Sequence, residues 1–314
     1  MAKNSFDPVG TLSIGNVVTT GTILYRSNFK RYLQVSLRAT AWLFALGIAA
    51  LVFVVIGALL FGATKSWLVF IPVSLGWIGV TLYFLAKYAT DRAVICRLAY
   101  QELIDAPETV AVATRELLPR TWGFLRLSLL LSLYMFLIAF FGSMALVIAI
   151  RMIVTIGIAL QGTLGTFAYI IIGILGIGLG ILLIVLILRF YAYWFVSELP
   201  LAIESTNTSS LASFGLRRSR QLSSTAVRQV ILIITVAFLI TIPLNTISSL
   251  PSLIGQTMAL STTQSVMAAG SFLVFIGFIL NIVVELFVMP FWQIIKAIVY
   301  FDLRNRREGG DLII

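Results

Sequence analysis

Long apolar stretches alternate with shorter polar segments along this chain of 314 residues. Each apolar stretch exceeds the roughly 20 residues that an α-helix, rising 1.5 Å per residue, needs to cross a hydrocarbon core of ~30 Å. The pattern predicts an all-α integral membrane protein, a bundle of six transmembrane helices. The predicted spans are residues 39–62, 67–88, 124–150, 166–195, 230–250 and 265–298.

Lys and Arg residues concentrate at alternate ends of the predicted spans. Counted together with the edges of the adjoining spans, twenty of the 22 lie in four segments: before the first span, between the second and third, between the fourth and fifth, and after the sixth. The other three connections carry one, one and none. Because cytoplasmic connections are enriched in positive charge, both termini are predicted to be cytoplasmic. A bacterial inner membrane or a thylakoid-type membrane would fit this topology.

A basic amphipathic segment precedes each pair of spans. In the first of these segments, apolar residues such as Val17 and Leu24 recur near helical spacing, while Arg26 and Lys30 take polar positions. Such a helix could lie in the inner headgroup layer or pack against the cytoplasmic ends of the bundle, and both interpretations remain open. We expect amphipathic helices on the cytoplasmic side of the membrane.

Within a single transmembrane domain covering residues 1–314, these segments suggest three tandem units. The units are residues 11–88, 105–196 and 207–300, each an amphipathic leader followed by a two-helix hairpin. Any alternation of hairpins under the same charge bias would produce a similar spacing, so the repeat is a hypothesis.

The composition supports the assignment to membrane proteins and indicates which partners surround the chain. Hydrophobic residues make up 60% of the chain, against about 45–50% in soluble domains. The net charge is +10, and the basic residues responsible for it lie beside the ends of the spans, where they would face anionic headgroups of the inner leaflet. The expected partners are therefore membrane lipids and a membrane protein or a second copy of this chain, and nucleic acid is not expected.

Residues that carry common catalytic chemistry are scarce. The chain has no His and a single Cys, Cys96, which excludes an internal disulfide and removes the commonest general base and metal ligand. We find no paired carboxylates, nucleophile elbow, phosphate-binding loop or dinucleotide fingerprint. The sequence predicts that the protein is not an enzyme and holds neither a cofactor nor a metal ion.

One acidic residue, Glu285, lies well inside a predicted span, where an ionisable group requires a partner or a wet cavity. Arg189 lies at a similar depth in the fourth span and could pair with it. Asn281 comes one turn before Glu285, and Pro290 follows, which predicts a kink in this helix because proline removes a backbone hydrogen bond. The three polar residues could form a gate or a proton or cation site. The lack of a second deep acid or a histidine favours a structural salt bridge or a snorkelling carboxylate.

Glycines follow a small-residue spacing in the fourth span. Gly173, Gly176 and Gly180 include a small-xxx-small pair, which lets a neighbouring helix approach closely. Two interpretations are open: the glycines form a face for homodimerisation, or they pack against another helix of the same bundle.

The C-terminal segment carries the most specific motif of the chain. Residues 299–312 read VYFDLRNRREGGDL, residues 198–204 read ELPLAIE, and residues 211–219 read LASFGLRRS. Together with LSIG at 12–15 and LYRSNF at 24–29, these segments resemble the bacterial family of the glycerophosphoryl diester phosphodiesterase membrane domain. In some members of that family the domain is fused to a separate phosphodiesterase. Since six spans and their connections occupy this chain, the resemblance implies the membrane part without the enzymatic activity.

The C-terminal motif interleaves acids with arginines beside the inner headgroups. Asp302, Glu308 and Asp311 could bond the basic leaders of the other units, while Arg304 and Arg306 lie between them. The motif could therefore act as a structural latch beneath the bundle or as a docking surface for a partner.

Two functions remain after these exclusions. The first is a scaffold or accessory subunit of a membrane complex, or an organiser of lipid, which the lack of catalytic residues and the three basic amphipathic segments favour. The alternative is a permease or lipid-handling transporter, with a pathway between the helical repeats near Glu285.

Overall fold

The computed structural model describes residues 14–164, 167–204, 211–261 and 263–308. Within these ranges the regular elements are all helices, joined by short turns, and no strand occurs. The predicted all-α fold class is therefore confirmed.

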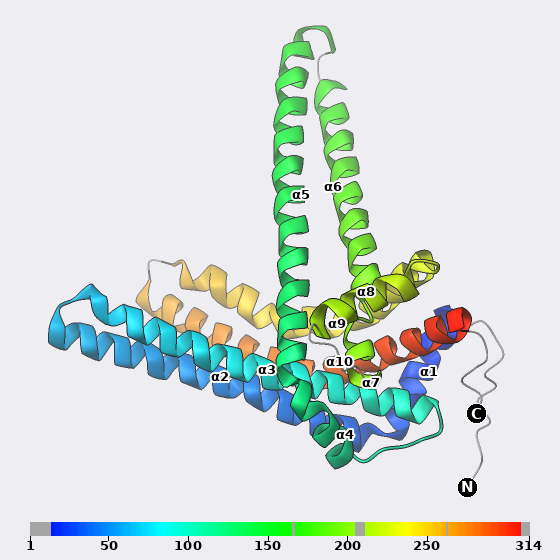
Figure 1. The fold of residues 1–314 in the computed structure, drawn as a ribbon. Coiled ribbons are helices and arrows are strands. Elements are labelled where there is room, and N and C mark those ends of the chain that lie inside the picture. Colours follow the sequence, from blue (N-terminus) through cyan, green and yellow to red (C-terminus); the bar gives the residue numbers. More distant parts are fainter. Residues whose placement is uncertain (1–13, 165–166, 205–210, 262, 309–314) are drawn as a thin grey trace.

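Six long helices pair as three antiparallel hairpins (Figure 1). The predicted spans fall on these helices in order, and each helix is long and apolar enough to cross a membrane. The chain thus has the architecture of a multi-pass membrane protein. The hairpins are α2 (Phe29–Thr64) with α3 (Phe70–Leu103), α5 (Thr121–Leu164) with α6 (Phe167–Trp194), and α9 (Val227–Ala259) with α10 (Gln264–Glu308).

Short helices connect the hairpins and precede each of them. α1 (Ile14–Ser27) leads into the first hairpin, and α4 (Val110–Leu117), with the 3₁₀ turn η2 (Leu118–Arg120), leads into the second. After α6 come α7 (Glu198–Ile203) and α8 (Leu211–Ser223), which leads into the third hairpin. A further 3₁₀ turn, η1 (Trp67–Val69), lies at the tip of the first. A short helix thus precedes each hairpin, and the division of the chain into three tandem units stays a hypothesis.

The tip of the first hairpin shows how local sequence ends and restarts a helix. Lys65 adopts a left-handed conformation with φ of 56°, and its backbone N–H bonds the carbonyl of Phe61. The side chain of Ser66 then accepts a hydrogen bond from the N–H of Leu68 and caps the next turn. Two polar residues therefore reverse the chain between two apolar helices.

The hydrophobic core lies where the bases of the hairpins meet. We call this region the basal core: α1, α4, α7, α8, the N-terminal ends of α2, α5 and α9, and the C-terminal ends of α3, α6 and α10. Its largest fully buried side chains include Tyr32, Tyr100, Tyr300, Phe124 and Phe195. By contrast, none of the most apolar segment of α3, α5 or α6 is buried within the chain. These segments present the apolar surface that a spanning helix offers to lipid.

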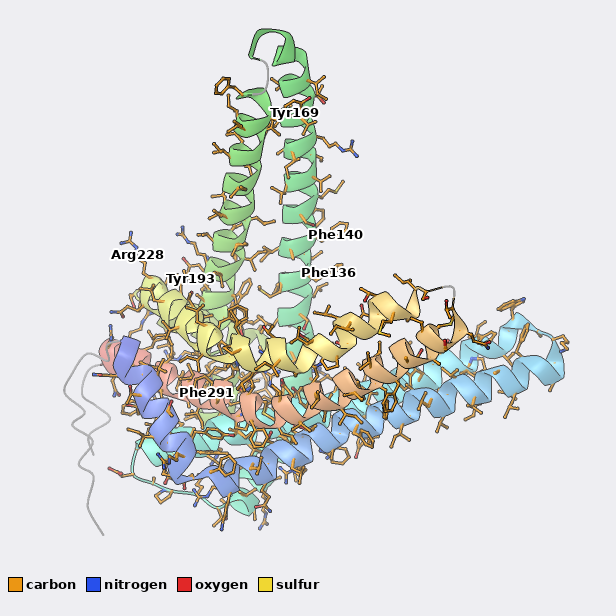
Figure 2. The ribbon with its side chains drawn as sticks, turned by 180° about the vertical axis from the view of Figure 1, so that it is seen from behind. Phe136, Phe140, Tyr169, Tyr193, Arg228 and Phe291 are labelled. Carbon is orange, nitrogen blue, oxygen red and sulfur yellow. The ribbon has the colours of Figure 1, made fainter. Side chains whose placement is uncertain are left out.

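The hairpins extend from the basal core in two directions. Figures 1 and 2 show α2–α3 and α9–α10 extending to the same side, while α5–α6 projects on its own. α10 contacts both α2 and α3, which joins the first and third hairpins. α1 and the C-terminal end of α10 both lie in the basal core (Figure 1).

α1 packs against the helices of the third hairpin. It contacts α9 and α10, and Val17 and Leu24 are buried in the contact. Gly21 allows this approach, since a Cβ added there would lie 2.8 Å from Cδ1 of Ile295. Of the two placements considered for this leader, the structure shows packing against the ends of the helices.

α9 and α10 approach each other backbone to backbone. A Cβ added at Gly270 would lie 2.6 Å from the backbone nitrogen of Ala259, and one at Gly277 would lie 2.6 Å from that of Ser252. Gly255 faces the carbonyl of Gly270 in the same way, at 2.5 Å. Glycine is needed at all three positions because any side chain would separate the helices.

Candidate functional site

Three charged side chains meet in the basal core. The carboxylate of Glu198, at the start of α7, accepts a hydrogen bond from Nη2 of Arg92 on α3 at 2.9 Å. Its other oxygen accepts from Nζ of Lys296 on α10 at 3.3 Å. The side chains of Glu198 and Lys296 are only 8% and 7% exposed. We call these residues the buried triad, which ties α3, α7 and α10 together.

Gln293 completes the bonding of the triad. With its amide oriented so that the oxygen faces Arg92, that oxygen accepts from Nε of Arg92 at 3.0 Å. The amide nitrogen then donates to Glu198 at 3.1 Å. The opposite orientation would place acceptor against acceptor and donor against donor. Cys96 is also buried here, with its sulfur 3.6 Å from the backbone carbonyl oxygen of Gln293.

Glu285 extends the triad toward the apolar part of the hairpins. Its carboxylate lies close to the hydroxyl of Tyr88 and within the electrostatic reach of Arg92, both on α3, without forming a direct ion pair among the described residues. Two acids, Glu285 and Glu198, therefore accompany two bases, Arg92 and Lys296. The charges of the four groups balance, which lowers the cost of burying each one.

The expected pairing of Glu285 with Arg189 is not present in the structure. Arg189 is exposed on α6, and within the described residues no ion pair joins it to an acid. The reason is that α6 belongs to the hairpin that projects away from α10 (Figure 1). The partner of Glu285 comes instead from α3, which packs against α10.

Asn281 takes part in a different contact from the one expected. Its side-chain oxygen accepts a hydrogen bond from the hydroxyl of Ser248 on α9 at 3.1 Å, and its amide donates to the carbonyl of Gly277 at 2.8 Å. A polar bond between two apolar helices is a common means of fixing their contact. Asn281 thus joins α9 to α10, beside the close approach at Gly277.

The glycines of α6 contact no other helix among the described atoms. A Cβ added at Gly173, Gly176 or Gly180 would meet nothing within 4 Å. Packing of this face inside the same chain, one of the two interpretations, is therefore not seen. The close glycine contact of this fold is formed by Gly255, Gly270 and Gly277 instead.

The C-terminal motif bonds the third leader and the third hairpin. Glu308 accepts from Arg218 on α8 and, at 2.8 Å, from Nε of Arg304. Arg306 pairs with Asp302 along α10 at 2.9 Å and donates to Gln229 on α9 at 2.7 Å. Asp311 lies outside the described residues. The latch role remains a prediction, with these bonds as its physical basis.

A second network connects α7 with α8 and α10. Glu204 accepts from Nε of Arg218 at 3.1 Å and from the hydroxyl of Tyr300 at 2.7 Å. Burial alone would lower the pKa of Arg218, but its bonds to Glu204 and Glu308 raise this pKa above its ordinary value. Nη1 of Arg120 donates to the carbonyls of Leu201 and Glu204, at 2.7 and 2.9 Å, and so caps α7.

The sequence analysis missed the buried triad, although one signal for it was present. Lys296 falls inside the predicted span 265–298, where a charge demands a partner just as Glu285 does. Glu198 and Arg92 carried no such signal, because both lie at or beyond the ends of predicted spans. Their pairing depends on how α3, α7 and α10 meet in space.

The fold and the triad define a class: an α-helical multi-pass membrane protein whose hairpins are held at one end by buried ion pairs. Comparison with family models, curated proteins and solved structures finds no match to this chain. In the described part of the chain, no three His, Cys, Asp or Glu side chains are grouped so that they could hold a metal ion.

Proposed function

We propose that this chain is a non-enzymatic integral membrane protein that acts as a scaffold or accessory subunit of a membrane complex, or organises lipid. The observation that carries the proposal is a contrast between the two parts of the fold. The charged groups of the buried triad satisfy one another, whereas the apolar segments of the hairpins contact little of their own chain. A basal core joined by ion pairs, with apolar hairpins left open to contact, suits a protein that binds neighbours in the membrane.

The α6 helix supports a protein neighbour more specifically. Gly173, Gly176 and Gly180 leave space along one helix, and nothing described in this chain fills it. A helix from another membrane protein or from a second copy of the chain could approach there closely. The same face would pack against lipid in the absence of such a partner.

The proposed location is the bacterial inner membrane or a thylakoid-type membrane, with both termini cytoplasmic. The distribution of Lys and Arg supports this orientation. The position of the basal core supports the same orientation, because its Lys and Arg side chains lie together at one end of the hairpins. Membership of the glycerophosphoryl diester phosphodiesterase membrane-domain family is likewise a proposal, based on the C-terminal motif.

The experiment that tests the proposal is purification from the native membrane in lipid nanodiscs, with mass spectrometry of everything that accompanies the chain. We expect a membrane protein in fixed stoichiometry with the wild-type chain. We expect its loss with Gly176→Leu, which fills the open face of α6. Gly79→Leu is the matched control, because the same substitution on α3 also meets open space. An unaccompanied wild-type chain would contradict the accessory-subunit form of the proposal.

A permease or lipid-handling transporter is the second candidate, because Glu285 lies beside Arg92 where α3 and α10 leave the basal core. The substitution Glu285→Gln separates the two functions. If the carboxylate serves transport, the variant is produced in normal amounts and loses its cellular function. If it serves the structure, the variant loses folded protein, measured as the monodisperse fraction after solubilisation.

A further inference from the structure

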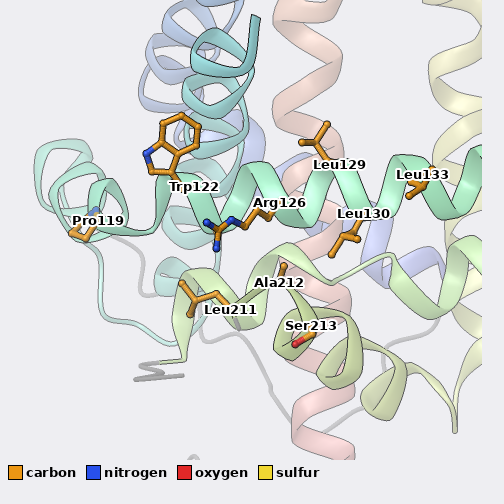
Figure 3. Close-up of a pocket in the computed structure, with 10 residues that line it drawn as sticks. Pro119, Trp122, Arg126, Leu129, Leu130, Leu133, Leu211, Ala212 and Ser213 are labelled. Atoms are coloured by element: carbon orange, nitrogen blue, oxygen red, sulfur yellow. The ribbon is translucent and has the colours of Figure 1, made fainter. Parts of the chain in front are cut away.

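An open groove lies between the start of α5 and the start of α8 (Figure 3). Its volume is about 590 Å³, within the ~300–1,000 Å³ common for ligand sites. Apolar side chains form most of its lining, and no acid is among the lining residues. The apolar members include Trp122, Leu129, Leu130, Leu133 and Leu211.

Two guanidinium groups accompany this groove. Arg126 lines it directly, is exposed, and forms no ion pair or donated hydrogen bond within the described residues. Figure 3 shows its side chain between Trp122 and Leu211. The second is Arg217, whose Nη2 lies 3.4 Å from the hydroxyl of Ser213, another lining residue. The groove thus combines an apolar wall with positive charge that no acid of the lining neutralises.

The position of Arg126 along α5 suits a lipid headgroup. Arg126 and Arg151 are the only charged residues of α5, and their separation of 25 positions corresponds to ~37 Å of helix. That length lies between the ~30 Å hydrocarbon core and the ~40–45 Å that includes both headgroup layers. Trp122, 54% exposed one turn before Arg126, is of a residue type enriched at the interface. Further along α5, toward its apolar segment, come Leu129, Leu130 and Leu133.

We infer that this groove binds one anionic phospholipid from the leaflet next to the basal core. The phosphate bonds Arg126 near Arg217, and an acyl chain lies along Leu129, Leu130 and Leu133. Two unneutralised cations favour an anionic headgroup over a zwitterionic one, because the ammonium of the latter would be repelled. The inference rests on the proposed membrane placement of α5–α6, but not on the presence of a protein partner.

The test is native mass spectrometry of the purified chain titrated with phosphatidylglycerol or phosphatidylcholine. We expect one tightly retained phosphatidylglycerol per chain and weaker retention of phosphatidylcholine. Arg126→Gln should weaken phosphatidylglycerol binding about tenfold, as loss of a charge-assisted hydrogen bond does. Ser213→Trp, which fills the groove from α8, should abolish the retained lipid.

Arg151→Gln is the matched control, because it removes the other arginine of the same exposed helix surface. It should bind phosphatidylglycerol as the wild type does. Equal binding by Arg126→Gln and the wild type, or equal retention of the two lipids by the wild type, would overturn the inference. Either result would leave the accessory-subunit proposal untouched, since that proposal is decided by the protein found with the chain.

Discussion

At the scale of single residues, burial determines which ion pairs matter. Glu198 is enclosed between Arg92 and Lys296, so removing its charge leaves two cations facing each other in a buried site. Breaking a buried pair on one side costs about 3–5 kcal/mol. Arg31 and Glu102 form a more exposed pair, at 32% and 26% exposed, and such pairs contribute about 0–1 kcal/mol.

We therefore predict that Glu198→Gln lowers the free energy of unfolding by about 3–5 kcal/mol, whereas Glu102→Gln lowers it by less than about 1 kcal/mol. Both substitutions keep the shape of the side chain and remove its charge. Unfolding by sodium dodecyl sulfate in mixed micelles, followed by circular dichroism, measures the difference. Equal losses in the two variants would show that the triad contributes no more to stability than an exposed ion pair does.

The residue scale also shows what the sequence could predict about the site. The need of Glu285 for a partner followed from its place in an apolar span, and the structure provides Arg92 and Tyr88. Arg189 was expected there because it lies at a similar depth. Depth in the membrane does not define which helix lies beside Glu285. Whether its partner comes from α3 or α6 depends on how the hairpins diverge.

At the scale of elements, the contact between α9 and α10 depends on glycines that no simple spacing identified. The α6 glycines follow a small-xxx-small pattern yet meet open space, while Gly255 and Gly270 come from two different helices. A pattern within one helix shows where close approach is possible. It does not show which helix will approach.

We predict that Gly270→Ala destabilises the protein by about 1–3 kcal/mol, because its Cβ would overlap the backbone of α9. Gly176→Ala should be neutral or stabilising by about 0.5–1 kcal/mol, since Ala favours a helix and meets open space. The same detergent unfolding measures both. A loss with Gly176→Ala that matched the loss with Gly270→Ala would argue against the assigned helix contact.

At the scale of the whole molecule, the spans and their order followed from local composition, whereas the directions of the hairpins did not. Apolar length is a property of each segment, so the six long helices agree with the predicted spans. The divergence of α5–α6 from the other hairpins arises in the basal core, from contacts between residues far apart in sequence (Figure 1).

We predict that a bilayer draws the hairpins closer together. Spanning helices tilt by about 20° on average, within about 0–40°, so three hairpins that cross one flat membrane must become more nearly parallel. Spin labels at Lys65 and Arg151, on the first and second hairpins, report the change as a distance. The distance should be shorter in nanodiscs than in detergent, and an unchanged distance would contradict the prediction.

The central claim is that all three hairpins cross one membrane and leave the basal core on the cytoplasmic side. Cysteines introduced singly at exposed positions, combined with a membrane-impermeant maleimide on intact cells, test it most directly. The native Cys96 gives little background because it is buried.

Lys65→Cys, Arg151→Cys and Leu260→Cys mark the three hairpins, and Arg115→Cys marks the basal core; all four positions are exposed. We expect the three hairpin cysteines to react in intact cells and the one at position 115 to react only after permeabilisation. Reaction of position 115 in intact cells, or protection of position 151 while positions 65 and 260 react, would contradict the account.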